Sequence, residues 1–297
     1  MPAPAYGLVC ITFSERCRYR SLTRTRFLAE KDEFARRSLL EHLYWENIHR
    51  LDRILTFCAM NNIRLYRVSS AIFPMSDEAM GESVLRGYSN LLAGIGRRVN
   101  RLGIRVVIHP DQFVVLNSEK PAVVETSIKI LAKHALFFDL LGLPLTPWAA
   151  MIIHGGKAGR GDELVKTIRS LPRNIRSRLC LENDEYAYSA DEIVDLCQRA
   201  GVPMIFDNLH HVIHEAIDSY DDPSVAKHVR EARKTWPKKD WQLVHLSNGH
   251  ASFRDRNHSH LISEIPAAYK NVPWIEVEAR GKEDAISAIV SGQVAKG

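Results

Sequence analysis

Short apolar runs alternate along this chain with longer segments in which apolar residues recur at helical spacing. The runs are rich in branched aliphatic residues and are bounded by glycine, proline or polar clusters. Such runs, flanked by helical patterns, are typical of strands that are buried on both faces. Eight strands are predicted, at residues 6–12, 63–69, 104–109, 151–154, 178–182, 202–207, 241–245 and 274–278.

The segments between these runs predict helices. The pattern in residues 32–60 ends at Asn61-Asn62, and Ser76 and Ser189 are expected to cap the helices that follow them. An Arg-rich stretch at residues 14–25 has no periodicity and is expected to be a loop. Helices are predicted at residues 32–60, 76–102, 122–141, 163–168, 190–200, 223–235, 261–268 (weakly) and 283–290.

Eight strand–helix alternations with short connections predict an α/β fold. Right-handed parallel crossovers close into a barrel at that count, so we expect a TIM (β/α)8 barrel that forms a single domain over residues 1–297. The alternative is a doubly wound open sheet with a glycine-rich phosphate loop. The only glycine cluster, Gly155-Gly156 with Gly159 and Gly161, lacks the order of residues that such a loop requires.

Composition limits the setting of the protein. The 297 residues are 45% apolar and 25% charged, as in ordinary globular proteins, and a net charge of +5 is compatible with a polyanionic partner. Five scattered cysteines without a C-x-x-C pair argue against a disulfide framework. No secretory pattern and no apolar run of membrane-spanning length occur, so we expect a cytoplasmic protein without membrane contact.

Potential metal ligands follow most of the predicted strands. In a barrel the carboxyl ends of all strands converge on one mouth, so these side chains are expected to gather there. Because unpaired buried charges are costly, their convergence indicates a bound cation. The candidates are His109, His154, Glu182, Asp207, His210, His245 and Glu278, with His258 or His260 on the loop after the seventh strand.

The number and type of these ligands narrow the chemistry. One catalytic ion takes three or four protein ligands, so seven or eight would hold two or three divalent ions. Imidazole and carboxylate without thiolate fit Mn²⁺ or Zn²⁺, and the many carboxylates favour Mn²⁺. Ions about 4 Å apart suit in-line displacement at phosphorus. Asn183, Asp184 and Asn208 could orient the ligands from behind.

Several motifs of this sequence resemble, in this order, those of the UV damage endonucleases. The resemblance runs from about residue 6 to residue 283, and LENDE followed by D-x-L-H-H is a specific combination. The motifs are YRVSS (66–70) with Pro74, IHPDQF (108–113), HGG (154–156), LENDE (181–185), FDNLHH (206–211), VHLS (244–247) and VEARGKE (277–283).

The resemblance implies a TIM barrel related to endonuclease IV, with a Mn²⁺-dependent cluster that cuts double-stranded DNA immediately 5′ to UV photoproducts. It implies the seven ligands above together with His258, which stands where the family has its histidine after VHLS. Glu182 and His109 would serve catalysis, and Lys282 would lie near the scissile phosphate. Gln112 and Phe113 match the pair that such enzymes push into the duplex at the lesion.

The sequence departs from the family pattern at three positions. Some members carry a modified lysine two residues before the histidine of VHL, and here that position is Leu243. Leu8 and Thr12 stand where the first strand of the family has Tyr and Asn. Lesion range or metal preference could therefore differ.

Basic residues cluster near the predicted mouth. Arg16, Arg18 and Arg20 lie with Tyr19 in the loop after the first strand, and Arg67 lies in the second strand. We expect these five residues to bind the DNA backbone, which would make binding salt-dependent. The other interpretation is a flexible basic loop with no fixed role.

The leading hypothesis is therefore a metal-dependent DNA repair endonuclease, expected to act as a monomer. An abasic-site endonuclease of the endonuclease IV type would use the same chemistry with narrower recognition. A xylose-isomerase-like sugar isomerase would use strand-end carboxylates to bind two ions and move a proton. Nicking of UV-irradiated, abasic and intact duplexes distinguishes these three.

Overall fold

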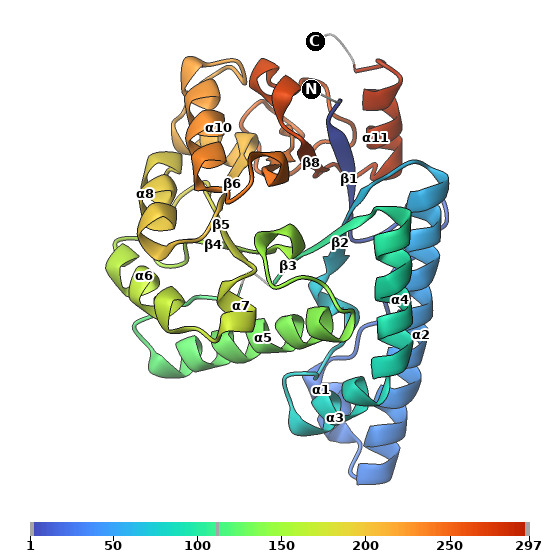
Figure 1. Cartoon of the computed structure of the whole chain (residues 1–297). Coiled ribbons are helices and arrows are strands. Elements are labelled where there is room, and N and C mark those ends of the chain that lie inside the picture. The colour runs from blue at the N-terminus through green and yellow to red at the C-terminus, as the bar shows by residue number, and fades with distance from the viewer. Residues whose placement is uncertain (1–2, 111–112, 295–297) are drawn as a thin grey trace.

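The chain forms a closed barrel of eight parallel strands in sequence order, in a computed structural model that describes residues 3–110 and 113–294 (Figure 1). Each strand pairs with the next, and β1 pairs with β8 to close the ring. The predicted TIM barrel is confirmed. The strands are β1 Ala5–Val9, β2 Leu65–Ser69, β3 Arg105–His109, β4 Met151–His154, β5 Leu179–Glu182, β6 Met204–Asp207, β7 Leu243–Leu246 and β8 Trp274–Val277.

Helices cover the outside of the barrel, with the long α2 and α4 side by side against one flank (Figure 1). Among the described residues, none of these helices has the length and apolar character needed to cross a bilayer. The α-helices are α1 Arg24–Ala29, α2 Glu33–Met60, α3 Ala79–Gly87, α4 Ser89–Leu102, α5 Pro121–Leu140, α6 Gly161–Ser170, α7 Arg173–Arg176, α8 Ala190–Ala200, α9 Asn208–His214, α10 Pro223–Thr235 and α11 Glu283–Val290. Short 3₁₀ helices are η1 Ser70–Ile72, η2 Pro147–Ala149, η3 Lys239–Trp241 and η4 Ala267–Asn271.

The single helix predicted at residues 76–102 is wrong, because the chain forms two helices that meet at Tyr88. The Tyr88 hydroxyl donates to the carbonyl of Glu41 on α2, which holds the junction against its neighbour. Ser76 is not the N-cap, since its hydroxyl donates backwards to the carbonyl of Phe73 at 2.8 Å. Glu78 occupies the cap position instead, without a side-chain capping bond.

The weak helix predicted at residues 261–268 is also wrong. The Asn248 side chain accepts from the backbone N–H groups of Ser263 and Glu264 at 2.8 and 3.0 Å, and these bonds hold the segment in an irregular path. Helical structure appears only from Ala267, as the 3₁₀ helix η4 that follows Pro266. A helix that the pattern did not predict, α9, begins directly at the end of β6.

Alternate strand residues face opposite sides of the barrel wall. Leu65, Val107 and Ile152 belong to a buried cluster inside the barrel, whereas Tyr66 and Ile153 pack in the larger cluster between strands and helices. The inward residues of β3 and β4 stand two positions before His109 and His154, on the same face of each strand. These inward residues form an apolar layer beneath the mouth.

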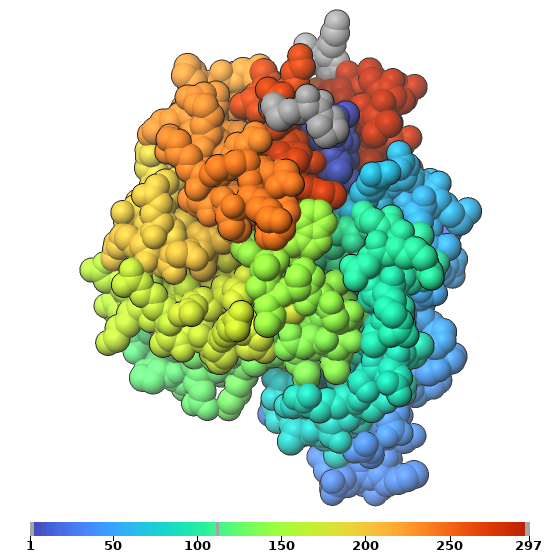
Figure 2. Space-filling model, viewed as in Figure 1, coloured from blue at the N-terminus to red at the C-terminus, as the bar shows by residue number. Residues whose placement is uncertain are grey.

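Arg105 lies at the opposite end of the barrel, at the start of β3, and is fully buried. Its guanidinium donates to the backbone carbonyls of Trp148, Trp241 and Pro147 at 2.8–3.0 Å. It also lies 4.8–5.4 Å from the rings of Trp148, Trp236 and Trp274. Figure 2, viewed as Figure 1, shows the green and orange parts of the chain meeting over the centre of this face. The cation and the indoles close this end of the barrel.

Replacement of Arg105 by Leu should lower the free energy of unfolding by ~3 kcal/mol, because three buried carbonyls lose a charged donor. Urea titration of the metal-free protein measures this change. Arg101→Leu, at an exposed position of α4, is the matched control and should change stability by less than about 0.5 kcal/mol. Equal stability of the two variants would contradict a role of Arg105 in closing the barrel.

Candidate metal centre

The predicted ligands do converge at the carboxyl ends of the strands. His109, His154, Glu182 and Asp207 are the last residues of β3, β4, β5 and β6. The strand register places His154 beside Glu182, and Asp207 beside His245 on β7. Glu278 follows β8 directly, and His210 lies in the first turn of α9. Seven predicted ligands, contributed by six strand ends and the start of α9, therefore lie together at the mouth of the barrel.

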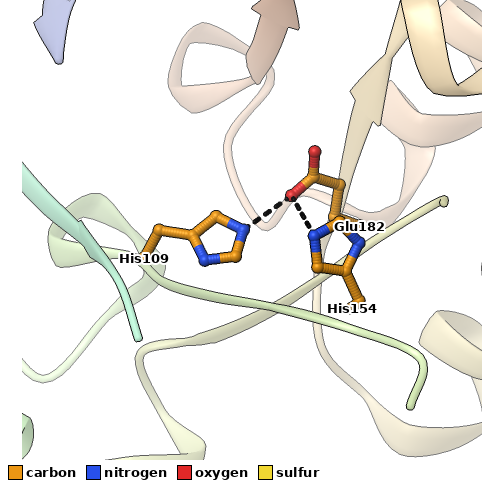
Figure 3. A group of neighbouring side chains, drawn as sticks. All are labelled: His109, His154 and Glu182. Atoms are coloured by element: carbon orange, nitrogen blue, oxygen red, sulfur yellow. Dashed lines mark hydrogen bonds and ion pairs between the residues drawn. The ribbon is translucent and has the colours of Figure 1, made fainter. Parts of the chain in front are cut away.

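One group of ligands joins β3, β4 and β5. Figure 3 shows the rings of His109 and His154 pointing toward the same carboxylate, Glu182. The Glu182 Oε2 atom lies 3.0 Å from Nε2 of His109 and 3.8 Å from Nε2 of His154. One atom from each residue lies within 4.8 Å of the other two, a spacing that could hold a metal ion.

Two further groups continue around the mouth and share residues with the first. Glu182, Asp207 and His210 form one of them, and Asp207, His245 and Glu278 form the other. Glu182 thus belongs to the first two groups and Asp207 to the last two. Carboxylates with two oxygens can bridge neighbouring ions, so this sharing is what a site for several ions requires.

Asparagine side chains hold the strand ends together beyond the last ladder bonds. Asn183 donates to the carbonyl of Asp207 at 3.0 Å and accepts from its N–H at 2.9 Å, which ties β5 to β6. Asn208 makes the same pair of contacts with Ser247 and ties β6 to the end of β7. The expectation that Asn183 and Asn208 support the site from behind agrees with these contacts.

The charges in the centre depend on one another. Burial raises the pKa of the Glu182 carboxyl, but the neighbouring imidazoles, led by that of His245, outweigh burial and hold the pKa well below its usual range. Burial lowers the pKa of the His245 imidazole, but Glu182 and Glu276 outweigh it and raise the pKa well above the ordinary value. Burial raises the pKa of Asp207. The cluster is acidic and favours positive charge.

The residues of the centre fit divalent metal ions. Oδ2 of Asp207 is buried and has no hydrogen-bond partner in the described part of the chain, although it lies among other ligands. The donor set is imidazole and carboxylate, which suits Mn²⁺ and Zn²⁺, and all five cysteines are outside it. A bound cation would balance the charge of this acidic cluster and would give the unsatisfied oxygen of Asp207 a partner.

Four residues singled out from the sequence are placed differently around the third group. Nδ1 of His258 lies 3.7 Å from Oε2 of Glu278, whereas the ring of His260 packs edge-on against Phe13. Lys282 caps α11 with a left-handed φ of 52°, a conformation that costs energy in a residue with a Cβ. Burial lowers the pKa of its ammonium group. Leu243 belongs to the apolar layer beneath His245.

A cavity of about 590 Å³ opens beside the first group, and sequence reasoning missed several of its residues. His109, His154 and His210 line it on the ligand side. Tyr186 and Arg256 line it elsewhere, with the guanidinium of Arg256 5.7 Å from the Tyr186 ring. Neither residue follows a strand directly, so the rule that identified the ligands could not identify them.

Glu276 was also missed, although a signal for it existed. It stands two residues before Glu278 on β8, so both side chains point to the same face of the strand. Its carboxylate is fully buried beside His245 and Arg67. An alternating E-x-E at the end of a buried strand could have identified it.

The predicted DNA contacts are placed in different ways. Phe113 is 72% exposed, while Gln112 lies outside the described residues. Arg16 and Arg18 are exposed in the loop after β1, and in the described residues their side chains form no ion pair within 4 Å. The remaining three have protein partners. Arg20 pairs with Glu46, the Tyr19 hydroxyl lies 2.8 Å from that of Tyr66, and Arg67 pairs with Glu276 and Glu278.

Sequence similarity to known proteins extends over almost the whole chain. The family model for UV-endonuclease UvdE matches residues 4–295. The chain belongs to this UV-endonuclease family. The predicted resemblance is therefore confirmed.

Relatives of known name support the membership in the UV-endonuclease family. The UV DNA damage endonuclease of Nostoc sp. is 54% identical over 291 residues, which cover 97% of this chain and 90% of the relative. That of Deinococcus radiodurans is 46% identical over 289 residues, covering 96% and 94%.

Solved structures show the same fold as this member of the UV-endonuclease family. The crystal structure of SacUVDE matches with a TM-score of 0.80 and 24% identity, covering 98% of this chain and 99% of that one. Endonuclease IV from Thermus thermophilus matches with a TM-score of 0.58 and 15% identity, covering 98% of each chain.

Replacement of Glu182 by Gln should weaken Mn²⁺ binding by about 10-fold or more, because this one carboxylate belongs to two of the three groups. Titration of metal-free protein with Mn²⁺, followed by electron paramagnetic resonance of the free ion, measures affinity and stoichiometry. Glu125→Gln, on the exposed face of α5, is the control and should bind Mn²⁺ like the unaltered protein. Unchanged binding by Glu182→Gln would remove Glu182 from the centre.

Proposed function

We propose that this chain is a metal-dependent DNA repair endonuclease that hydrolyses the phosphodiester bond immediately 5′ to UV photoproducts. Its membership in the UV-endonuclease family and its coverage of the named relatives support the activity. The observation that carries the metal dependence is the sharing of Glu182 and Asp207 among three ligand groups. We propose two or three divalent ions, with Mn²⁺ preferred and Zn²⁺ as the second choice.

The proposed ligands fall into three groups around the mouth, which would hold the ions between them. His109, His154 and Glu182 would hold one ion, and the residues of the other two groups, with His258 at the edge, would hold the rest. Ions in this arrangement would supply positive charge for the phosphate oxygens and would lower the pKa of water. The apolar layer beneath the ligands excludes solvent from below, which strengthens electrostatic interactions at the site.

Lys282 is proposed to contact the scissile phosphate. Its ammonium group lies near Glu278 and Arg67 in a partly buried position, at the edge of the third ligand group. A cation held in a water-poor site stabilises the charge that develops on phosphate oxygens more strongly than one in bulk water. The left-handed backbone at Lys282 costs stability, and such strained residues cluster at functional sites, which supports a role for this side chain in the reaction.

The proposed DNA contacts fall on the loops around the mouth. Arg16 and Arg18 are the proposed phosphate contacts, with Arg20 available if it leaves Glu46. We propose that Tyr19 and Arg67 support this surface from behind through their protein partners. Phe113, with its exposed ring, would enter the base stack at the lesion together with Gln112.

The decisive test is nicking of end-labelled duplexes that differ only at one site. UV-irradiated, abasic and intact DNA are incubated with the Mn²⁺-loaded protein, and the cut is mapped to the nucleotide. We expect cleavage at the phosphodiester 5′ to the photoproduct, little cleavage of intact DNA, and loss of cleavage after chelation.

Other outcomes favour the alternatives. Cleavage at abasic sites alone would indicate an activity of the endonuclease IV type. Absence of cleavage on all three substrates, together with turnover of a ketose or aldose, would overturn the nuclease proposal in favour of a sugar isomerase.

Replacement of Phe113 by Ala should reduce the preference for UV-irradiated over intact duplex by about tenfold, because stacking of one base on an aromatic ring contributes ~1–3 kcal/mol. Competition binding with the two duplexes measures the ratio. Phe34→Ala removes a similarly exposed ring from α2, outside the cavity lining and the ligand groups, and should leave the ratio unchanged. A ratio unaffected by Phe113→Ala would show that the ring does not probe the lesion.

A further inference from the structure

The two ring nitrogens of His245 face different surroundings. Nδ1 lies 2.8 Å from Oε1 of Glu182, 3.4 Å from Oε1 of Glu278 and 4.0 Å from Oδ2 of Asp207. These carboxylates are the proposed ligands, and the third ligand group places the histidine with Asp207 and Glu278. Nδ1 is therefore the ring nitrogen that faces the proposed metal centre.

The other nitrogen faces Glu276. Nε2 of His245 lies 3.1 Å from Oε2 of Glu276, within ion-pair distance, and the strand register pairs these two residues across β7 and β8. Both side chains are fully buried. Neither Nε2 of His245 nor Oε1 of Glu276 has a hydrogen-bond partner in the described part of the chain. Oε2 of Glu276 is the carboxylate oxygen that faces this unsatisfied nitrogen.

Arg67 on β2 contacts the same oxygen of Glu276 that faces His245. Its Nη1 atom lies 3.0 Å from Oε2 of Glu276 and also contacts Glu278. The guanidinium offsets the charge of a carboxylate that has almost no solvent contact. With Arg67 at this oxygen, the Glu276 carboxylate is better placed to accept a hydrogen bond from an imidazole N–H than to bind a metal ion.

We infer that Glu276 is a positioning residue that fixes the proton of His245 on Nε2, so that Nδ1 is free to bind a metal ion. A carboxylate behind a histidine ligand holds the ring in orientation, fixes its tautomer and makes the ligating nitrogen more basic. The inference rests on the proposed metal centre and assigns Glu276 and Arg67 to its support. It also explains why a charged pair is buried below the ligand level.

The tautomer of His245 tests the inference directly in the unaltered protein. The chain is loaded with Zn²⁺, which is diamagnetic, and its ¹⁵N-labelled histidines are observed by long-range ¹H–¹⁵N nuclear magnetic resonance. His245→Asn identifies the signals by their loss. We expect a proton on Nε2 and none on Nδ1. A proton on Nδ1, with the metal shift on Nε2, would overturn the inference.

The variant Glu276→Gln keeps the shape of the side chain and removes its charge. We expect its Mn²⁺ affinity to fall by about 10- to 100-fold, with the number of ions unchanged at saturating metal. Glu283→Gln is the matched control, because Glu283 is buried at the same end of the barrel but bonds the backbone of Phe13 and Ser14 instead. Its Mn²⁺ affinity should equal that of the unaltered protein.

The outcomes separate this inference from the proposed function. If the unaltered protein binds no Mn²⁺, the metal centre itself fails. If it binds Mn²⁺ and Glu276→Gln binds equally well, only the role of Glu276 fails. Loss of one whole ion from Glu276→Gln, with the His245 tautomer retained, would make Glu276 a ligand and would also overturn its positioning role.

Discussion

Charge balance among buried groups at the mouth of the barrel constrains the rest of this structure. Glu182, Asp207 and His245 have almost no contact with solvent, so each charge must be met by a neighbour. Imidazoles meet carboxylates across β5 and β7, and Arg67 meets Glu276 and Glu278. The arrangement is stable only while strands far apart in sequence keep their register.

Two devices keep that register where the ladder bonds end. Short strands leave few backbone bonds near the mouth, and the amides of Asn183 and Asn208 replace the missing ones between β5, β6 and β7. The start of α9 at the end of β6 adds a third fixed point, because Asp207 accepts the N–H of His210 at 2.9 Å and brings that imidazole into the centre. The same polar residues therefore terminate strands and set the positions of ligands.

Much of this could be predicted from the sequence because barrel geometry turns strand ends into neighbours. Eight apolar runs predicted the fold, and the residues that end them predicted which side chains gather at the mouth, including His109 and Asp207. Partners across the barrel could not be predicted. The pairing of Arg67 with Glu276 on β8 was not foreseen, because the two residues are far apart in sequence and Glu276 stands among apolar residues of its strand. The failed helix at residues 261–268 has the same cause, since the distant Asn248 holds that segment.

Arg105 and the tryptophan rings around it close the far end of the barrel, and this closure affects how ions and water reach the proposed metal centre. With that end filled by described residues, ions and water would reach the ligands through the cavity at the mouth. Under the proposed function a DNA duplex would lie across that same opening. Ion exchange and substrate residence would then exclude each other, so the protein would take up its metal between encounters with DNA and retain it throughout each one.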